Sequence, residues 1–282
     1  MKLAPFLKLL ACRPAEALHR IEGMFDIRFE HLWVSPPQYA AAQLELILEG
    51  LELALQADLR LILREGALAE IEELVRGSMQ LLPPDAPFAA SHSADFLLAR
   101  LCYALCRASR PSVAVETGVC YGVTSAFLLK AMQVNGRGEL HSIDLPPLGA
   151  HAEAFVGRLV PDRLHPRWRL YRGASKLLLP RVLQRVGSVD LFVHDSLHTR
   201  RNMRRELATV TSRLGRPAVV ICDDIEGNAT FGQWLSTAQP QFSGIVQEGS
   251  KASLFGVALL LGDEGSRQAA AVATSDPAGG SR

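Results

Sequence analysis

The sequence predicts an α/β fold, a doubly wound parallel sheet that ends in an antiparallel hairpin and follows an α-helical amino-terminal region. Three observations support this prediction. From position 110 onward, short β-branched runs alternate with stretches of about 20 to 30 residues, which leave room for one crossover helix between strands. The last two apolar runs lie too close together for such a helix. No convincing strand precedes residue 85.

The amino-terminal third, residues 1–85, is expected to be helical. Leu and Ala, which are good helix formers, dominate residues 39–64. In residues 67–77 the apolar side chains recur at helical spacing, and Gly77 is placed to cap the end of that helix. We expect this region to form either a cap over the substrate or an oligomerisation element.

A stretch rich in Pro and Ser, residues 81–93, separates this region from a predicted core at 86–262. A helix near 93–108 opens the core. Five parallel strands are then expected, followed by two hairpin strands joined by "GSKAS". In chain order the seven strands are 112–118, 139–145, 167–173, 189–195, 217–224, 242–248 and 254–262. The end of the chain, 263–282, is small and polar and is expected to be a disordered tail.

Composition restricts the class of partner. The formal net charge is +1 and 48% of the 282 residues are hydrophobic, so neither a nucleic acid nor an anionic membrane is called for. A small molecule is the expected ligand. The five cysteines form no C-x-x-C pair, which favours a reducing cytoplasm over a disulfide framework or a zinc cluster. No apolar run approaches the roughly 20 residues of a membrane helix.

A glycine turn follows the first predicted strand, in "VAVETGVCYGVTSAFLLK" (113–130). Gly118 and Gly122 allow close approach of a ligand, and the following helix points free N–H groups at it. Cys120 replaces the middle glycine of the dinucleotide fingerprint, which argues against a nicotinamide cofactor. Glu116 would repel a pyrophosphate but attract an ammonium or sulfonium group. Asp144 ends the second strand, where it either binds ribose hydroxyls or caps a helix.

Acidic residues follow two later strands. Asp195 and Asp223 are separated by one strand–helix–strand step, so they are expected to end neighbouring parallel strands and to face one cleft together with Asp224. Oxygen ligands of this kind suit Mg²⁺ or a similar divalent cation. His198 is placed to act as a general base. The alternative is that Asp195 touches a cofactor, Asp223 caps a helix and Asp224 is solvated.

These motifs together resemble those of class I S-adenosylmethionine-dependent methyltransferases. "ETGVCYGVTS" is similar to their first motif, in the form found in catechol O-methyltransferase, and "RGASKLLLPRV" is similar to the segment they place against adenine. "DLFVHDSLH" and "VICDDIEGN" resemble the metal-binding strand ends of macrocin- and mycinamicin-type sugar O-methyltransferases. The resemblance covers about 110–262 and implies a Rossmann-like sheet of seven strands.

The resemblance also implies a role for each matching position. The amino-acid end of the cofactor would be surrounded by Glu116, Gly118, Gly122 and Thr124, and its ribose would be bound by Asp144. Ala174 and Ser175 would lie near the adenine. The metal ligands would be Asp195, Asp223 and Asp224, with Asp195 also near the cofactor and His198 beside it in catalysis. Lys176 departs from the pattern, because relatives often carry a neutral polar residue there.

The sequence therefore predicts a cytoplasmic, metal-dependent O-methyltransferase that uses S-adenosylmethionine to modify a hydroxyl of a natural product or sugar. Two alternatives remain open at this point. The fold can use a metal or a sulfonium cofactor for other chemistry, or it can serve as a non-catalytic scaffold. A homo-oligomer formed through the amino-terminal helices is possible in each case. The arginines at 200, 201, 204 and 205 are interpreted as a solvated face. Asn228 and Phe231 are expected to border the acceptor pocket, whereas His194 alternates away from it and is expected to be structural.

Overall fold

In the computed structural model, which describes residues 3–37, 39–88, 94–149, 151–249 and 253–262, a seven-stranded sheet forms the centre of the chain. The strand order is β3-β2-β1-β4-β5-β7-β6, and β7 runs antiparallel to both β5 and β6, whereas the other neighbouring strands are parallel. The predicted α/β fold with its carboxy-terminal antiparallel hairpin is therefore confirmed. The predicted tail, 263–282, lies outside the described residues. The strands are β1 (Val113–Thr117), β2 (Glu139–Asp144), β3 (Trp168–Arg172), β4 (Val189–His194), β5 (Leu214–Cys222), β6 (Phe242–Gln247) and β7 (Leu254–Leu260).

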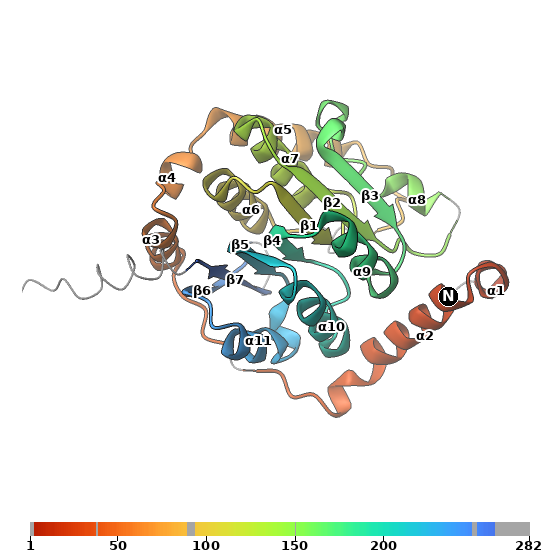
Figure 1. The fold of residues 1–282 in the computed structure, drawn as a ribbon. Coiled ribbons are helices and arrows are strands. Elements are labelled where there is room, and N and C mark those ends of the chain that lie inside the picture. The colour runs from red at the N-terminus through yellow and green to blue at the C-terminus, as the bar shows by residue number, and fades with distance from the viewer. Residues whose placement is uncertain (1–2, 38, 89–93, 150, 250–252, 263–282) are drawn as a thin grey trace, which may run out of the picture.

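Helices cover both faces of this sheet (Figure 1). One face packs against α3 (Leu44–Leu55), α5 (Gly66–Gln80), α6 (Phe96–Ser109) and α7 (Val123–Asn135). The other face packs against α9 (Ser175–Val186), α10 (Arg200–Thr211) and α11 (Thr230–Ala238). Since the central strands are covered on both sides, their side chains are buried almost without interruption, as expected for parallel strands. Shorter helical segments are α4 (Leu59–Ile62), α8 (Ala152–Phe155), η3 (Asp162–Arg167) and η4 (Ile225–Gly227).

The amino-terminal region is helical, but its boundaries differ from the sequence prediction. Residues 39–64 do not form one helix, because Gln56 adopts a left-handed conformation at the end of α3 and the Asp58 side chain then caps α4. Gly77 does not end its helix, and α5 continues to Gln80. Two further helices, α1 (Leu3–Cys12) and α2 (Pro14–Phe29), form an arm along one edge of the molecule and lead into η1 (Glu30–Leu32) (Figure 1).

Among the described residues, no helix has both the length and the apolar character that spanning a membrane requires.

Candidate active site

The strand register aligns the carboxyl ends of β2, β1, β4 and β5 along one edge of the sheet. The hydrogen-bond ladder runs past the strand ends, where the N–H groups of Gly118, Asp195 and Asp223 each donate to a neighbouring strand at 2.8 Å. Their acceptors are the carbonyl oxygens of Ile143, Thr117 and His194, in that order. Asp195 and Asp223 therefore end neighbouring strands, as the sequence predicts, and the glycine turn lies beside them.

Gly118 is required at this edge for steric reasons. Its φ angle is +85°, and a Cβ atom there would lie 1.7 Å from the carbonyl oxygen of Asp195. Any larger residue would push the turn after β1 away from the turn after β4. Gly118 thereby allows the turn after β1 to lie in contact with the turn after β4.

Asp144, at the end of β2, is held by the backbone of the glycine turn. Its Oδ2 atom accepts hydrogen bonds from the N–H groups of Val119 at 2.8 Å and Cys120 at 3.0 Å. Burial raises the pKa of this carboxyl above its usual range, although the two hydrogen bonds oppose the shift. The other oxygen, Oδ1, is buried and has no hydrogen-bond partner. A ligand hydroxyl would satisfy that oxygen, which fits a ribose-binding role.

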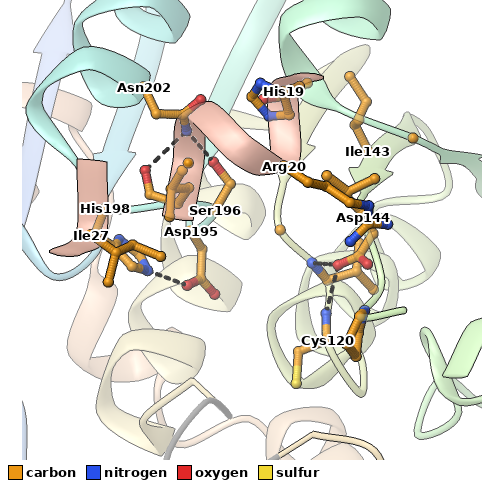
Figure 2. A pocket seen from close by; sticks show the side chains of 18 of the residues that line it. His19, Arg20, Ile27, Cys120, Ile143, Asp144, Asp195, Ser196, His198 and Asn202 are labelled. Carbon is orange, nitrogen blue, oxygen red and sulfur yellow. Dashed lines mark hydrogen bonds and ion pairs between the residues drawn. The ribbon is translucent and has the colours of Figure 1, made fainter. Parts of the chain in front are cut away.

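A cavity of about 680 Å³ opens between these strand ends and α2. Figure 2 shows Asp144 and Cys120 on one side of it and Asp195, Ser196 and His198 on the other. Five side chains or backbone positions on α2 complete the wall, and none was predicted from the sequence. These α2 residues are His19, Arg20, Gly23, Met24 and Ile27.

The residues predicted for the cofactor fall into two groups. Those that line the cavity are Gly118, Asp144, Ser175 and Asp195. Those that are not among its lining residues are Glu116, Gly122, Thr124 and Ala174, all in or next to the turns that support it. Glu116 is fully buried, and its Oε2 atom accepts hydrogen bonds from Ser125 and Ser142. Burial raises the pKa of Glu116 to about 7 despite these two bonds.

The acidic half of the cavity contains the three predicted metal ligands, Asp195, Asp223 and Asp224. A fourth carboxylate, Glu248 at the end of β6, was not predicted. Oxygens of Asp223, Asp224 and Glu248 lie within 4.8 Å of one another, close enough to share one ion. Burial and the nearby charges of Asp223, Glu116 and Asp224 hold the pKa of Asp195 well above its usual range. This group of acids has the oxygen-only character that Mg²⁺, Mn²⁺ or Ca²⁺ prefers.

His198 stands next to these acids. Its Nε2 atom lies 3.5 Å from Asp224 and 3.8 Å from Asp195, and 29% of its side chain is exposed. Burial lowers the pKa of His198 to about 4, with His194 adding to the effect and Asp224 opposing it. The imidazole is therefore neutral near pH 7, which is the form able to accept a proton.

A buried glutamate on α10 holds the loop that carries Asp195 and His198. Glu206 accepts hydrogen bonds from Thr117 Oγ1 at 2.6 Å and His194 Nδ1 at 2.7 Å, on β1 and β4. It also accepts hydrogen bonds from Ser196 Oγ at 2.9 Å and Asn202 Nδ2 at 3.1 Å. His194 is fully buried in this network, in agreement with the structural role expected for it. Nothing in the sequence pattern of α10 predicts that Glu206 accepts so many buried hydrogen bonds.

Three other sequence interpretations can be compared with the structure. The arginine cluster is not merely solvated, because the Arg200 backbone N–H bonds to Glu30 and the Arg201 guanidinium lies 3.4 Å from Asp26, both in the α2–η1 segment. Asn228 donates to the carbonyl of His198 and supports the catalytic loop from outside the cavity. Phe231, expected near the acceptor, is fully buried in the core beside Trp234.

Comparisons with known proteins agree with this geometry. Residues 115–225 match the family model described as a methyltransferase domain. This segment is therefore similar to a methyltransferase domain. It contains the glycine turn, Asp144 and all three aspartates of the acidic half. The predicted resemblance to methyltransferases agrees with this match, and the seven-stranded sheet agrees with the fold that the resemblance implies. Comparison with curated proteins found no match.

Solved structures share the fold of this chain. An O-methyltransferase of Bacillus cereus in complex with SAH is 12% identical, with a TM-score of 0.52 over 70% of this chain and 91% of that one. A candidate O-methyltransferase of Klebsiella pneumoniae is 15% identical, with the same TM-score and coverage. A candidate caffeoyl-CoA O-methyltransferase of Staphylococcus aureus is 12% identical, with a TM-score of 0.50 over 74% of this chain and 99% of that one. At these identities the likeness concerns the fold alone.

Proposed function

We propose that this methyltransferase moves the methyl group of S-adenosylmethionine to a hydroxyl of a small natural product or sugar, in the cytoplasm, with a divalent cation such as Mg²⁺. The observation that carries the proposal is a single cavity that joins Asp144 to Asp195, Asp223 and Asp224. A nucleoside-type site and an acidic site thereby share one space. Neither nucleic acid nor membrane is needed as a partner.

The cofactor half is built by Gly118, Asp144 and Ser175, which line the cavity. S-adenosylmethionine supplies a methyl group on a positively charged sulfur. The buried Oδ1 atom of Asp144 would accept a hydrogen bond from a ribose hydroxyl, while Oδ2 would stay bound to the backbone. Asp195 lines the same cavity and, when ionised, would favour a sulfonium over a neutral ligand.

The acceptor half would hold the cation and contains the base. Asp223, Asp224 and Glu248 offer carboxylate oxygens within sharing distance of one ion, and Asp195 lies next to Asp223. A divalent cation bound there would supply positive charge to these acids and would lower the pKa of an acceptor hydroxyl. His198 takes the proton of that hydroxyl. The imidazolium that forms is stabilised by Asp224 and Asp195, at 3.5 and 3.8 Å.

Calorimetric titration with S-adenosylmethionine and with S-adenosylhomocysteine tests the cofactor half. Saturable binding is expected for both, and no binding to either would refute the proposal. Mass spectrometry of reactions with hydroxylated natural products and sugars then tests the chemistry. The expected product gains one methyl group, and this gain is lost in chelator and restored by Mg²⁺. Full activity in chelator would exclude the role given to the cation but not the role given to the cofactor.

A further inference from the structure

The amino-terminal arm exposes a concentration of apolar side chains. Of the 17 large hydrophobic residues that are exposed in the described part of the chain, ten lie between positions 7 and 33. Isolated exposed hydrophobic residues are normal on a protein surface, whereas apolar side chains that gather on one face mark an interaction site. The ten are Leu7, Leu10, Leu18, Ile21, Met24, Phe25, Ile27, Phe29, Leu32 and Trp33.

These residues divide between two faces of α2. Met24 and Ile27 line the catalytic cavity. Leu18, Ile21, Phe25 and Phe29 lie on a different face, within an arc of about 80° when successive residues are placed 100° apart around the helix. Leu32 and Trp33 follow beyond the end of α2, and Trp33 stacks on Phe25. We call this second set the outer stripe.

Aromatic contacts tie the middle of the outer stripe together. The rings of Phe25 and Phe29 lie 4.6 Å apart, and Phe25 stacks on Trp33 at 6.3 Å. Even so, Phe25 is 52% exposed and Trp33 is 57% exposed. The three rings therefore form a preordered apolar surface that this chain itself leaves in contact with water.

We infer that the outer stripe is a two-fold interface on which a second copy of this chain docks, with the two α2 helices antiparallel. The spacing supports this occupant. Leu18 and Leu32 stand seven positions to either side of Phe25, and Ile21 and Phe29 stand four positions to either side. An antiparallel pair centred on Phe25 therefore places Leu18 opposite Leu32 and Ile21 opposite Phe29 of the second copy. A self-complementary pattern of this kind is what a two-fold interface requires.

The available area is sufficient for a stable pair. Six half-exposed residues of the outer stripe contribute roughly 600 Å² per copy, since a large aromatic side chain buries 150–250 Å² when fully covered. Two copies reach about 1,200 Å², the lower limit for a specific protein–protein interface.

The pairing would also affect the active site. Because α2 presents Gly23, Met24 and Ile27 to the cavity and the outer stripe to the second copy, docking would fix the wall of each cavity from behind. This inference does not depend on the methyl-transfer proposal, and either one can fail alone.

Sedimentation equilibrium of the full chain tests the pairing. A mass of twice 30.7 kDa is expected at micromolar concentration. The Phe25→Glu variant should be monomeric, whereas Leu61→Glu, which changes a leucine that is 65% exposed on α4, should remain a dimer. Circular dichroism establishes that both variants are folded. A monomeric parent protein, or a dimeric Phe25→Glu variant, would overturn the inference.

Cross-linking tests the register. In a Cys12→Ser background, Phe25→Cys should be joined to its second copy by a short thiol cross-linker, and Leu61→Cys should not. Sedimentation with anionic phospholipid vesicles tests the alternative that a membrane, and not a second copy, covers the apolar arm. If the parent protein is monomeric and binds vesicles through Phe25, the stripe is a membrane-binding surface and the proposed pairing is wrong.

Discussion

The two halves of the cavity handle negative charge in opposite ways. At the β1–β2 edge a single carboxylate, Asp144, is held by two backbone N–H groups and leaves one oxygen for a ligand. At the β4–β5 edge, Asp195 is crowded by Asp223 and Asp224, and His198 beside them is kept neutral. The first half is complete before a ligand arrives. The carboxylates of the second half repel one another unless positive charge is added, and this is the physical reason for placing a metal ion at the β4–β5 edge.

The largest effect is expected in the acidic half. Replacing Asp223 with Asn should reduce kcat/KM by about 10³-fold, because an amide provides no negative charge for the cation. Thermal stabilisation by Mg²⁺ should disappear, while the affinity for S-adenosylmethionine should change less than about twofold. Activity assays, thermal shift and calorimetry measure the three quantities. Asp85→Asn, at an exposed position, is the matched control. Equal losses of cofactor affinity and metal response would remove the division between the halves.

A second effect concerns Glu206, whose negative charge is balanced by the groups around it. Burial opposes the ionisation of Glu206, but His194 and hydrogen bonds from Ser175 and Thr117 outweigh it and lower its pKa to about 2. This stabilising contribution is complete above the unfolded value of 4.5 and is lost as the pH falls towards 2. Glu206→Gln should cost about 3 kcal/mol of unfolding free energy at pH 7.

Denaturant unfolding at pH 7 and at pH 3 measures that contribution. The difference in stability between the Glu206→Gln variant and the parent should shrink at the lower pH, where the parent also loses part of its charge. Glu73→Gln, on the exposed side of α5, should change little at either pH. A cost for Glu206→Gln that is independent of pH would show that the bonds, and not the charge, hold the catalytic loop.

The cofactor half should respond more weakly. Asp144→Asn keeps an oxygen for the backbone N–H groups of Val119 and Cys120 but loses one acceptor oxygen for the ribose. We expect the Kd for S-adenosylmethionine to rise about 10- to 30-fold, equivalent to about 1.4–2 kcal/mol. The thermal shift caused by Mg²⁺ should stay as in the parent protein. A variant that binds the cofactor normally would remove Asp144 from the ribose site.

The sequence predicts the edge residues well because their positions follow from the strands. Buried parallel strands are recognisable as apolar runs, and an acid directly after such a run must lie at the carboxyl edge. Asp144, Asp195 and Asp223 are placed by this rule alone. The rule also explains the misassignment of Phe231, since the helix that follows an edge turns its side chains back to the core.

The residues that escaped prediction come from elements with no such constraint. Glu248 ends the hairpin strand β6, which reaches the site only because β7 pairs with β5. Arg20 and Gly23 lie on a helix whose docking depends on tertiary contacts, and nothing in the local pattern identifies which face meets the cavity. Likewise, α3 ends at Gln56 because this residue adopts a left-handed conformation, which the surrounding helix-forming Leu and Ala residues do not predict.

The smallest effect is expected where α2 meets the cofactor half from outside. Lys176, which departs from the pattern of related enzymes, donates to Glu22 on α2 at 2.8 Å, and both side chains are about 40% exposed. An exposed ion pair contributes less than about 1 kcal/mol, and salt screens it. Lys176→Gln should therefore weaken S-adenosylmethionine binding by less than about threefold at low salt and have no effect at 1 M salt. Calorimetry at both salt concentrations tests this.

Arg169→Gln, which loses an exposed pair with Glu139 on the β2–β3 side, is the control and should leave binding unchanged. A large, salt-independent loss in Lys176→Gln would mean that Lys176 touches the cofactor itself.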